Sequence, residues 1–185
     1  MDQESWRFIN TFAPWLSAIG TILAVITSLY LARRSRKIRL RISAGHRLLL
    51  LPGAEGEPLE YLVIEIVNIG SRIANINNIG WKLGFLRKQM FVQMIINDNL
   101  SSTIPIELKD GEKASYFFPF YDEIQWLDSF AKNLGHFPRI HARSLKVLAH
   151  TSIGQSFEAK IESGLRGELI KARRKQLASK TDKPN

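Results

Sequence analysis

The side chains of this sequence that are best suited to chemistry are its histidines, because the chain contains no cysteine. His136, His141 and His150 follow one another along the chain, and three neutral imidazoles can bind zinc or another divalent metal. Their spacings of five and nine residues differ from the i, i+4 spacing of a helical metal site. We therefore expect ordinary surface or edge histidines, and a metal-dependent enzyme is the last of three functional hypotheses.

Two carboxylate pairs, Glu55 with Glu57 and Asp122 with Glu123, are the candidates for general acid–base catalysis. The first pair lies in a loop rich in Gly and Pro, and the second opens a predicted helix, where carboxylates favour the N-terminus. The hydroxyl run 101–103 has no base nearby in the sequence and no G-x-S-x-G context. The absence of cysteine excludes a disulfide framework and a thiol nucleophile. The sequence therefore predicts a protein that is not an enzyme and takes no cofactor or metal.

One segment, residues 12–32, contains no charged residue and reads FAPWLSAIGTILAVITSLYLA. About 20 helical residues cross a hydrocarbon core of roughly 30 Å, so this segment predicts a single transmembrane helix. Trp15 and Tyr30 suit the two membrane interfaces, and Pro14 is expected in the first helical turn. A cleaved signal peptide is disfavoured, because the chain starts acidic and the apolar run ends in cations rather than in a small-residue cleavage site.

The formal net charge of +9 is concentrated in two blocks, one after the apolar segment and one at the C-terminus. The first block contains six cations: Arg33, Arg34, Arg36, Lys37, Arg39 and Arg41. The positive-inside rule therefore predicts that residues 1–11 lie outside a bacterial inner (plasma) membrane and that the C-terminal domain is cytoplasmic. Residues 33–37 form a basic juxtamembrane segment, whose expected partners are the lipid bilayer and its anionic headgroups. Nucleic acid is disfavoured as a partner.

Small residues recur along the predicted membrane helix at Gly20, Ala24 and Ser28. The i, i+4, i+8 spacing puts them on one face, where small side chains let two helices approach closely. Gly, Ala and Ser are also common in membrane helices in general. Association through this face, with a second copy or a larger membrane protein, therefore stays open.

After the basic segment the sequence alternates apolar and polar residues over short runs, as half-buried strands do. The expected strands cover residues 38–51, 59–67, 73–86, 90–96, 104–108, 114–120, 144–151 and 156–162. Within the third of these, Ile76, Ile79, Trp81 and Leu83 are expected in the core. Seven or eight short strands with turns between them predict a mainly β fold over residues 38–163, an antiparallel β-sandwich of immunoglobulin-like type.

Two segments break the strand pattern. Residues 122–134 carry apolar side chains at helical spacing and predict one inserted helix. Residues 164–185 are expected to form a basic C-terminal helix, over 165–178, and a disordered tail from 180. The apolar stripe of this basic helix is thin, so lipid contact and a solvated end are equally expected, and contact with nucleic acid comes third.

An aromatic run precedes the inserted helix. Its candidate partner-surface residues are Tyr116, Phe118, Phe120, Tyr121 and Trp126. Such a run, followed by an amphipathic helix, can form a binding ridge. The favoured alternative is a strand with both faces covered, one by the sandwich core and one by the helix.

Three stretches carry a likeness to known proteins: WLSAIGTILAVITSLYLARRSRK, IRLRISA and VIEIVNIGSRIANINNIGW. In the last of them Asn68-x-Gly70 makes a turn and Trp81 follows. This order resembles a broad group of small bacterial single-pass inner-membrane proteins with a cytoplasmic β-sandwich domain. The resemblance covers roughly the first half of the chain and implies topology and a β domain, without an activity or functional residues.

The leading functional hypothesis is a membrane-tethered cytoplasmic interaction module, an adaptor or regulatory protein. It would bind an unidentified protein partner or form a homo-oligomer. The second hypothesis is a small accessory subunit of a membrane protein complex, docked through its transmembrane helix.

Overall fold

The computed structural model describes residues 3–50, 58–85, 88–95, 99–120 and 126–181 of the chain. The chain divides into two compact units, 1–37 and 38–185. The first unit consists of one helix, α1 (Gln3–Ser35). Pro14 lies inside α1 and not in its first turn, which corrects the prediction, because the helix already begins at Gln3.

The segment Pro14–Arg34 of α1 has a mean hydropathy of 1.8, and none of it is buried. It therefore has the length and the apolar surface of a membrane span, which an N-terminal signal sequence also has. The predicted apolar helix over 12–32 is confirmed in this coarse form.

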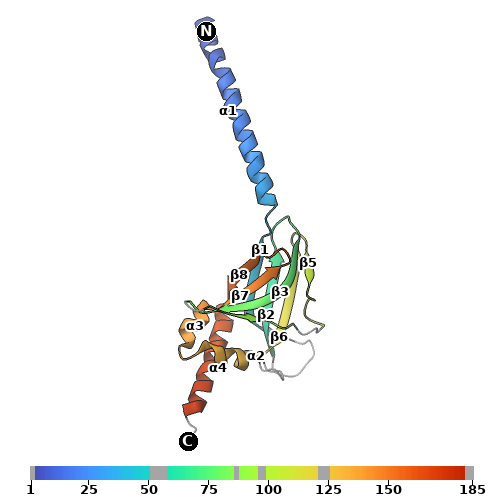
Figure 1. The fold of residues 1–185 in the computed structure, drawn as a ribbon, viewed down its shortest axis with the longest axis vertical. Helices are drawn as coiled ribbons and strands as arrows, with labels where there is room; N and C mark the ends of the chain where they lie inside the picture. Colours follow the sequence, from blue (N-terminus) through green and yellow to red (C-terminus); the bar gives the residue numbers. More distant parts are fainter. Residues whose placement is uncertain (1–2, 51–57, 86–87, 96–98, 121–125, 182–185) are drawn as a thin grey trace. The chain divides into compact units, whose positions relative to one another are not determined.

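The described part of the second unit contains eight strands (Figure 1). They are β1 (Leu40–Leu49), β2 (Leu59–Asn68), β3 (Ala74–Leu83), β4 (Gln89–Val92), β5 (Ile106–Leu108), β6 (Lys113–Pro119), β7 (Lys146–Thr151) and β8 (Ser156–Lys160). Each overlaps one of the predicted strands. β1 and β3 are each four residues shorter than predicted, and β4 ends at Val92 although the prediction ran to residue 96, which lies outside the described residues.

The strands form two antiparallel sheets, with orders β1-β2-β6 and β4-β3-β7-β8. β5 pairs with the edge of β3 that β4 also uses, because β7 occupies the other edge. β4 approaches β3 so closely that a Cβ on Gly80 would lie 2.7 Å from the backbone oxygen of Phe91. Only glycine allows this pairing without a backbone shift.

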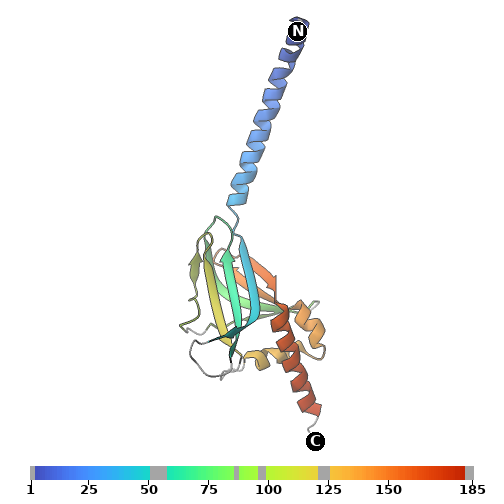
Figure 2. The ribbon, with the colours of Figure 1, turned by 180° about the vertical axis from the view of Figure 1, so that it is seen from behind.

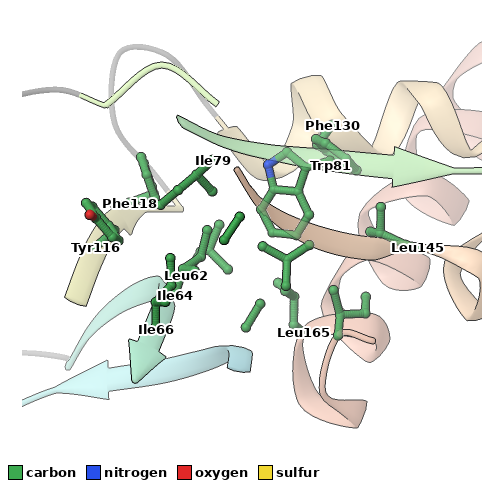
Figure 3. Close-up of a cluster of buried hydrophobic side chains, with 14 of the residues drawn as sticks. Leu62, Ile64, Ile66, Ile79, Trp81, Tyr116, Phe118, Phe130, Leu145 and Leu165 are labelled. Carbon is green, nitrogen blue, oxygen red and sulfur yellow. The ribbon is translucent and has the colours of Figure 1, made fainter. Parts of the chain in front are cut away.

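The inner faces of the two sheets contribute to one hydrophobic core (Figure 3). Ile76, Ile79, Trp81 and Leu83 are all buried, as predicted for β3. Ile76 and Ile79 both face the core although three positions separate them, because the register of β3 against β7 shifts between Ile76 and Asn78. The alternation of apolar and polar side chains thus selects the buried face of each strand, and the register shift in β3 brings Ile76 and Ile79 to the same face.

The outer edge of β6 is covered by two serines. The amide of Ser102 donates to the carbonyl of Ser115 over 2.8 Å. The hydroxyls of Ser101 and Ser102 accept from the amides of Phe117, at 3.0 Å, and Ser115, at 3.1 Å. These hydroxyls complete a strand edge that would otherwise be open.

The helices of the second unit gather at one end of its sheets (Figures 1 and 2). They are α2 (Trp126–Ala131), the 3-10 turn η1 (Lys132–Leu134), α3 (Pro138–Ser144) and α4 (Ser163–Thr181). α2 follows β6, which ends at Pro119. Tyr61 of β2 pairs with Pro119 on one side and with Arg47 of β1 on the other, so β6 ends beside the C-terminal part of β1. The helices therefore lie at the end of the sheets opposite to Leu40.

The helices differ from the prediction in three respects. The inserted helix is described only from Trp126, so residues 122–125 lie outside the described residues. α3 was not among the predicted helices; with seven residues and two buried side chains it has too short an amphipathic pattern to stand out. α4 continues to Thr181, so Lys180 and Thr181 are helical and not part of a disordered tail. The content is thus a mixture of helix and strand and not mainly β.

Candidate interaction surface on α3 and α4

The β6 part of the predicted aromatic surface is buried. Tyr116, Phe118 and Phe120 are 0%, 5% and 1% exposed and belong to the core (Figure 3 shows the first two). They turn inward because β6 alternates in register with β2, whose core residues Leu62 and Ile64 stand opposite Phe118 and Tyr116. These three residues therefore offer no surface to a partner, so the candidate partner surface is wrong for them, and their burial agrees with the favoured alternative of a core strand. Tyr121 lies outside the described residues.

Trp126 holds α2 to the second sheet. Its ring stacks on Phe130, with centroids 5.1 Å apart, and on Phe120, at 6.4 Å. The indole N–H groups of Trp126 and Trp81 both donate to Oε1 of Gln93, at 3.0 Å and 2.8 Å. One amide oxygen thus fixes two tryptophans from different elements, so the half-buried Trp126 is an anchor of the fold.

Two large apolar side chains of α3 are exposed at this end of the unit, where Leu48, Leu50 and Phe85 are exposed as well. Phe137 and Ile140 are 66% and 55% exposed. Phe137 is the N-cap residue and Pro138 occupies the first turn, where the missing amide of proline costs least. The helix buries Ala142, so the opposite side of this short helix, with Ile140, is left to solvent.

Two cavities flank α3, and Ile140 lines both of them. The first, of about 370 Å³, lies between α3 and α4. Its lining, which we name the α3–α4 patch, consists of His136, Phe137, Pro138, Arg139, Ile140, Arg174 and Leu177. The second, of about 530 Å³, lies between α3 and the end of β3, and is lined by Leu83, Gly84, Phe85, Gln89, Asn133, Ile140 and His141. Ile140 therefore forms a ridge between two hollows.

α4 is held rigidly under the α3–α4 patch. Arg173 is only 8% exposed, and its Nε donates to the carbonyl of Gly135 over 2.8 Å. Gln176 continues this contact, because its amide donates to the backbone carbonyl of Asp128 at 2.8 Å. These bonds join α4 to the segments on both sides of η1. The positions of the neighbouring Arg174 and Leu177 are therefore set by the fold.

The rim of the α3–α4 patch is cationic. Arg139 and Arg174 line its cavity and are exposed, and Arg143 follows Arg139 one turn later on α3. Among the residues that the structure describes, none of these three arginines has an acidic partner within ion-pair distance. No carboxylate of the described residues lines the cavity. The patch thus joins apolar surface to uncompensated positive charge.

Two acidic residues elsewhere in the second unit are compensated, in contrast. Glu158 on β8 contacts Lys146 and Lys82, and their hydrogen bonds lower the pKa of its carboxyl to about 2, with that of Lys146 the stronger cause. Glu162 forms a two-bond pair with Arg47, at 2.7 Å and 2.8 Å, which lowers the pKa of its carboxyl. Glu158 and Glu162 are thus already paired with cations of their own, whereas no acidic side chain of the described residues pairs with the arginines of the α3–α4 patch.

The three histidines weighed as a candidate metal site lie apart in the structure. His136 lines the α3–α4 patch, His141 lines the other cavity, and Nδ1 of His150 lies 2.7 Å from the hydroxyl of Ser156 on β8. Within the described ranges no group of three His, Asp or Glu side chains is placed to hold a metal ion.

The residues predicted to meet lipid and a second helix are solvent-accessible. The six basic residues Arg33, Arg34, Arg36, Lys37, Arg39 and Arg41 are all exposed. Gly20, Ala24 and Ser28 are exposed along α1, and Ala24 and Ser28 line a shallow groove on it. The assignments of these two sets to lipid headgroups and to a second helix stay predictions.

The apolar stripe of α4 has a structural role. Leu165 and Leu169 are fully buried and belong to the core, and Ala172 packs against it. The helix therefore keeps its apolar face inside the unit, which disfavours the predicted alternative in which α4 lies on lipid.

Comparison with known proteins adds no family to this description. No protein-family model matches the chain, and no curated protein does. Among solved structures, a Bordetella pertussis protein provisionally called ApaA is 15% identical, with a TM-score of 0.32 over 68% of this chain and 89% of its own. The structural-genomics target SoR45 is 12% identical, with a TM-score of 0.28 over 69% of this chain and 84% of its own. Structural similarity at this low identity and TM-score supports no conclusion about the family or the function of this chain.

Sequence reasoning missed the α3–α4 patch, although one local signal was present. The tetrapeptide Phe137-Pro138-Arg139-Ile140 combines a helix-starting proline with two large apolar side chains and one arginine. Arg174 and Leu177 come from a distant segment, and only the packing of α4 brings them to the same cavity.

Proposed function

We propose that this protein is a membrane-tethered interaction module and not an enzyme. In this proposal α1 anchors the chain in a bacterial inner membrane, and the 38–185 unit binds a protein partner on the cytoplasmic side. The single observation that carries the proposal is the exposure of Phe137 and Ile140 beside a cavity with a cationic rim. Exposed apolar side chains at a concave surface are typical of sites that bind other proteins.

The anchor and its direction follow from α1 and the residues after it. A helix of this length and hydropathy suits a bilayer, and the cations Arg33, Arg34, Arg36 and Lys37 at its end favour the cytoplasmic side. The same cluster is proposed to contact anionic headgroups. A resident membrane anchor, and not a cleaved signal sequence, is proposed because no small-residue cleavage site follows the apolar run.

We also propose that the second unit is an immunoglobulin-like sandwich. The sheet orders β1-β2-β6 and β4-β3-β7-β8 correspond to strands A-B-E and C′-C-F-G of that fold. Trp81, buried on β3, takes the place of the core tryptophan on strand C. In such a sandwich the loops and helices at the sheet ends are free to form a binding surface, as α3 would here.

Membrane extraction and crosslinking test the proposal together. The full chain should stay in the membrane pellet after alkaline extraction, and a C-terminal reporter should be cytoplasmic. A photo-crosslinking residue at Ile140 should then give an adduct of a second protein or a second copy. The same residue at Lys109, which is exposed on the opposite end of the unit, is the matched control. A soluble full chain, or equal adducts from both positions, would contradict the proposal.

The accessory-subunit hypothesis is the second candidate, and the groove along α1 favours it. Ala24 and Ser28 line that groove. Larger residues there would fill it and keep a second helix from packing closely against this face of α1. In this case Gly20→Leu with Ala24→Leu should abolish complex formation, and Ile140→Asp should leave it intact. The opposite pattern supports the interaction module.

A further inference from the structure

We propose that the α3–α4 patch binds an acidic amphipathic segment of a partner protein. An apolar side chain of that segment would occupy the cavity beside Phe137, and its carboxylates would pair with Arg139 and Arg174. This inference rests on the proposed function, because it specifies the chemistry of the partner at the same surface.

The apolar part of the proposal follows from the cavity floor. Phe137, Pro138, Ile140 and Leu177 contribute apolar surface to a cavity of about 370 Å³. That volume accommodates one or two large side chains, and it is at the low end of small-ligand pockets. Because Phe137 is 66% exposed, it gains burial only if another molecule covers it.

The acidic part follows from charge complementarity. Arg139 and Arg174 lie on the rim of the cavity, and no acidic side chain in the described part of the chain pairs with them. Guanidinium groups bind carboxylates through two parallel hydrogen bonds, which fixes orientation as well as adding attraction. Arg143, one turn further along α3, extends the positive surface in the direction that a bound segment would follow.

The fold prepares this surface before anything binds. The buried Arg173 and Gln176 fix α4 to Gly135 and Asp128, as described above. α3 cannot move away freely either, because Leu145 at its C-cap is fully buried. A preformed cavity lowers the ordering cost of association.

Anionic lipid is the competing occupant of a cationic and apolar surface. A membrane-lying helix needs a wide apolar face directed at the bilayer. Here Leu165 and Leu169 of α4 are directed into the core, and the patch itself exposes two large apolar side chains, Phe137 and Ile140. A surface with one narrow hollow between two helices therefore fits a peptide side chain better than a sheet of lipid.

Binding of a defined peptide tests the inference. The probe is a fluorescent peptide of about 14 residues with Leu at helical i, i+3 and i+4 positions and Glu elsewhere. The receptor is the full chain in nanodiscs of uncharged lipid, with empty nanodiscs as the blank. We expect saturable binding, at least about tenfold weaker for R139E combined with R174E, and weaker at high salt.

Two controls make the result specific. The pair K109E and K160E changes the net charge of the protein equally at exposed positions away from the patch, and it should bind the probe like the wild type. A peptide with Gln in place of every Glu should bind at least about tenfold more weakly than the acidic probe. Equal binding of both peptides, or equal loss in both charge variants, would overturn the inference.

A lipid arm separates the competing occupant. Vesicles of phosphatidylglycerol replace the peptide, and their association with the nanodisc-held protein is measured by co-flotation. If the vesicles bind in a manner that needs Arg139 and Arg174 and the peptide does not bind, the acidic-segment inference is wrong and the patch binds lipid.

The proposed function can survive this failure. If Ile140→Asp abolishes co-purification of the partner that crosslinking identified, while R139E with R174E retains it, the interaction module stands and its partner is not acidic. If neither variant affects partner binding, the surface itself is wrong.

Discussion

Asn68 is the residue at which the structure predicts the largest effect of a small substitution. Its side chain is fully buried at the end of β2 and makes three hydrogen bonds. Nδ2 donates to the carbonyls of Arg72, at 2.8 Å, and Leu108, at 2.9 Å, and Oδ1 accepts from the amide of Gly70 at 3.0 Å. One side chain therefore closes the turn between β2 and β3 and ties it to the end of β5.

Replacing Asn68 with alanine removes all three bonds and leaves the Leu108 carbonyl and the Gly70 amide buried without this partner. Each bond contributes about 0.5–1.5 kcal/mol net, so we expect the free energy of unfolding to fall by about 2–4 kcal/mol. Asn68→Asp keeps the acceptor for Gly70 but turns a carboxylate oxygen toward two carbonyls. It should cost at least as much at neutral pH, and less where the carboxyl is protonated.

Urea denaturation of the full chain in detergent micelles, followed by tryptophan fluorescence, measures these values. Asn75→Ala is the matched control, because this exposed asparagine lies on β3 and its change should stay within about 0.5 kcal/mol. A loss below about 1 kcal/mol for Asn68→Ala would refute the reasoning, since it would mean that the turn holds without the buried amide.

Three further predictions concern single side chains. Tyr116→Phe should raise the unfolding free energy by about 1 kcal/mol, because the hydroxyl is buried without a partner in the described residues. Burial also raises the pKa of Tyr116 to about 12, so the unfolding free energy of the wild type should fall as pH rises from 10 toward 12. A pH titration of the variant should lack this decrease. Gln93→Leu deprives two indole N–H groups of their acceptor and should cost about 1–3 kcal/mol, with a shift of tryptophan emission in the same urea experiment. The pKa of Glu158 is lowered to about 2, so its ion pairs stabilise the fold above pH 4.5 and lose this effect as pH falls toward 2. Because the carboxylate is 38% exposed, Glu158→Gln should lower the unfolding free energy by no more than about 1 kcal/mol at pH 7. In acid denaturation the unfolding free energies of wild type and variant should become equal near pH 2.

The sequence predicted the strands of the second unit well, and the reason is local. A strand repeats every two residues, so the buried face of β3 can be read from Trp81 and Leu83 without knowledge of its neighbours. The turn at Asn68 and Gly70 was also visible, because Asn bonds its own backbone two residues on. What the sequence did not contain was the bond from Asn68 to Leu108, forty residues away.

The candidate site was predicted poorly for the complementary reason. The run from Tyr116 to Phe120 has the composition of a binding ridge, and its composition is equally that of a core strand. Only pairing with β2 and packing between the sheets decided that these rings are inside. Burial depends on what lies opposite a side chain, and that information is not local.

The sequence by itself determined an apolar helix, a cationic segment after it and a domain built on alternating strands. These features need only composition and period, which are properties of neighbouring residues. The tertiary structure alone decided that Phe137 and Ile140 face outward and that Arg139 of α3 meets Arg174 of α4 at one cavity. Contacts between distant segments arise from the packing of the whole unit, so the surface proposed to bind a partner became visible only in the folded chain.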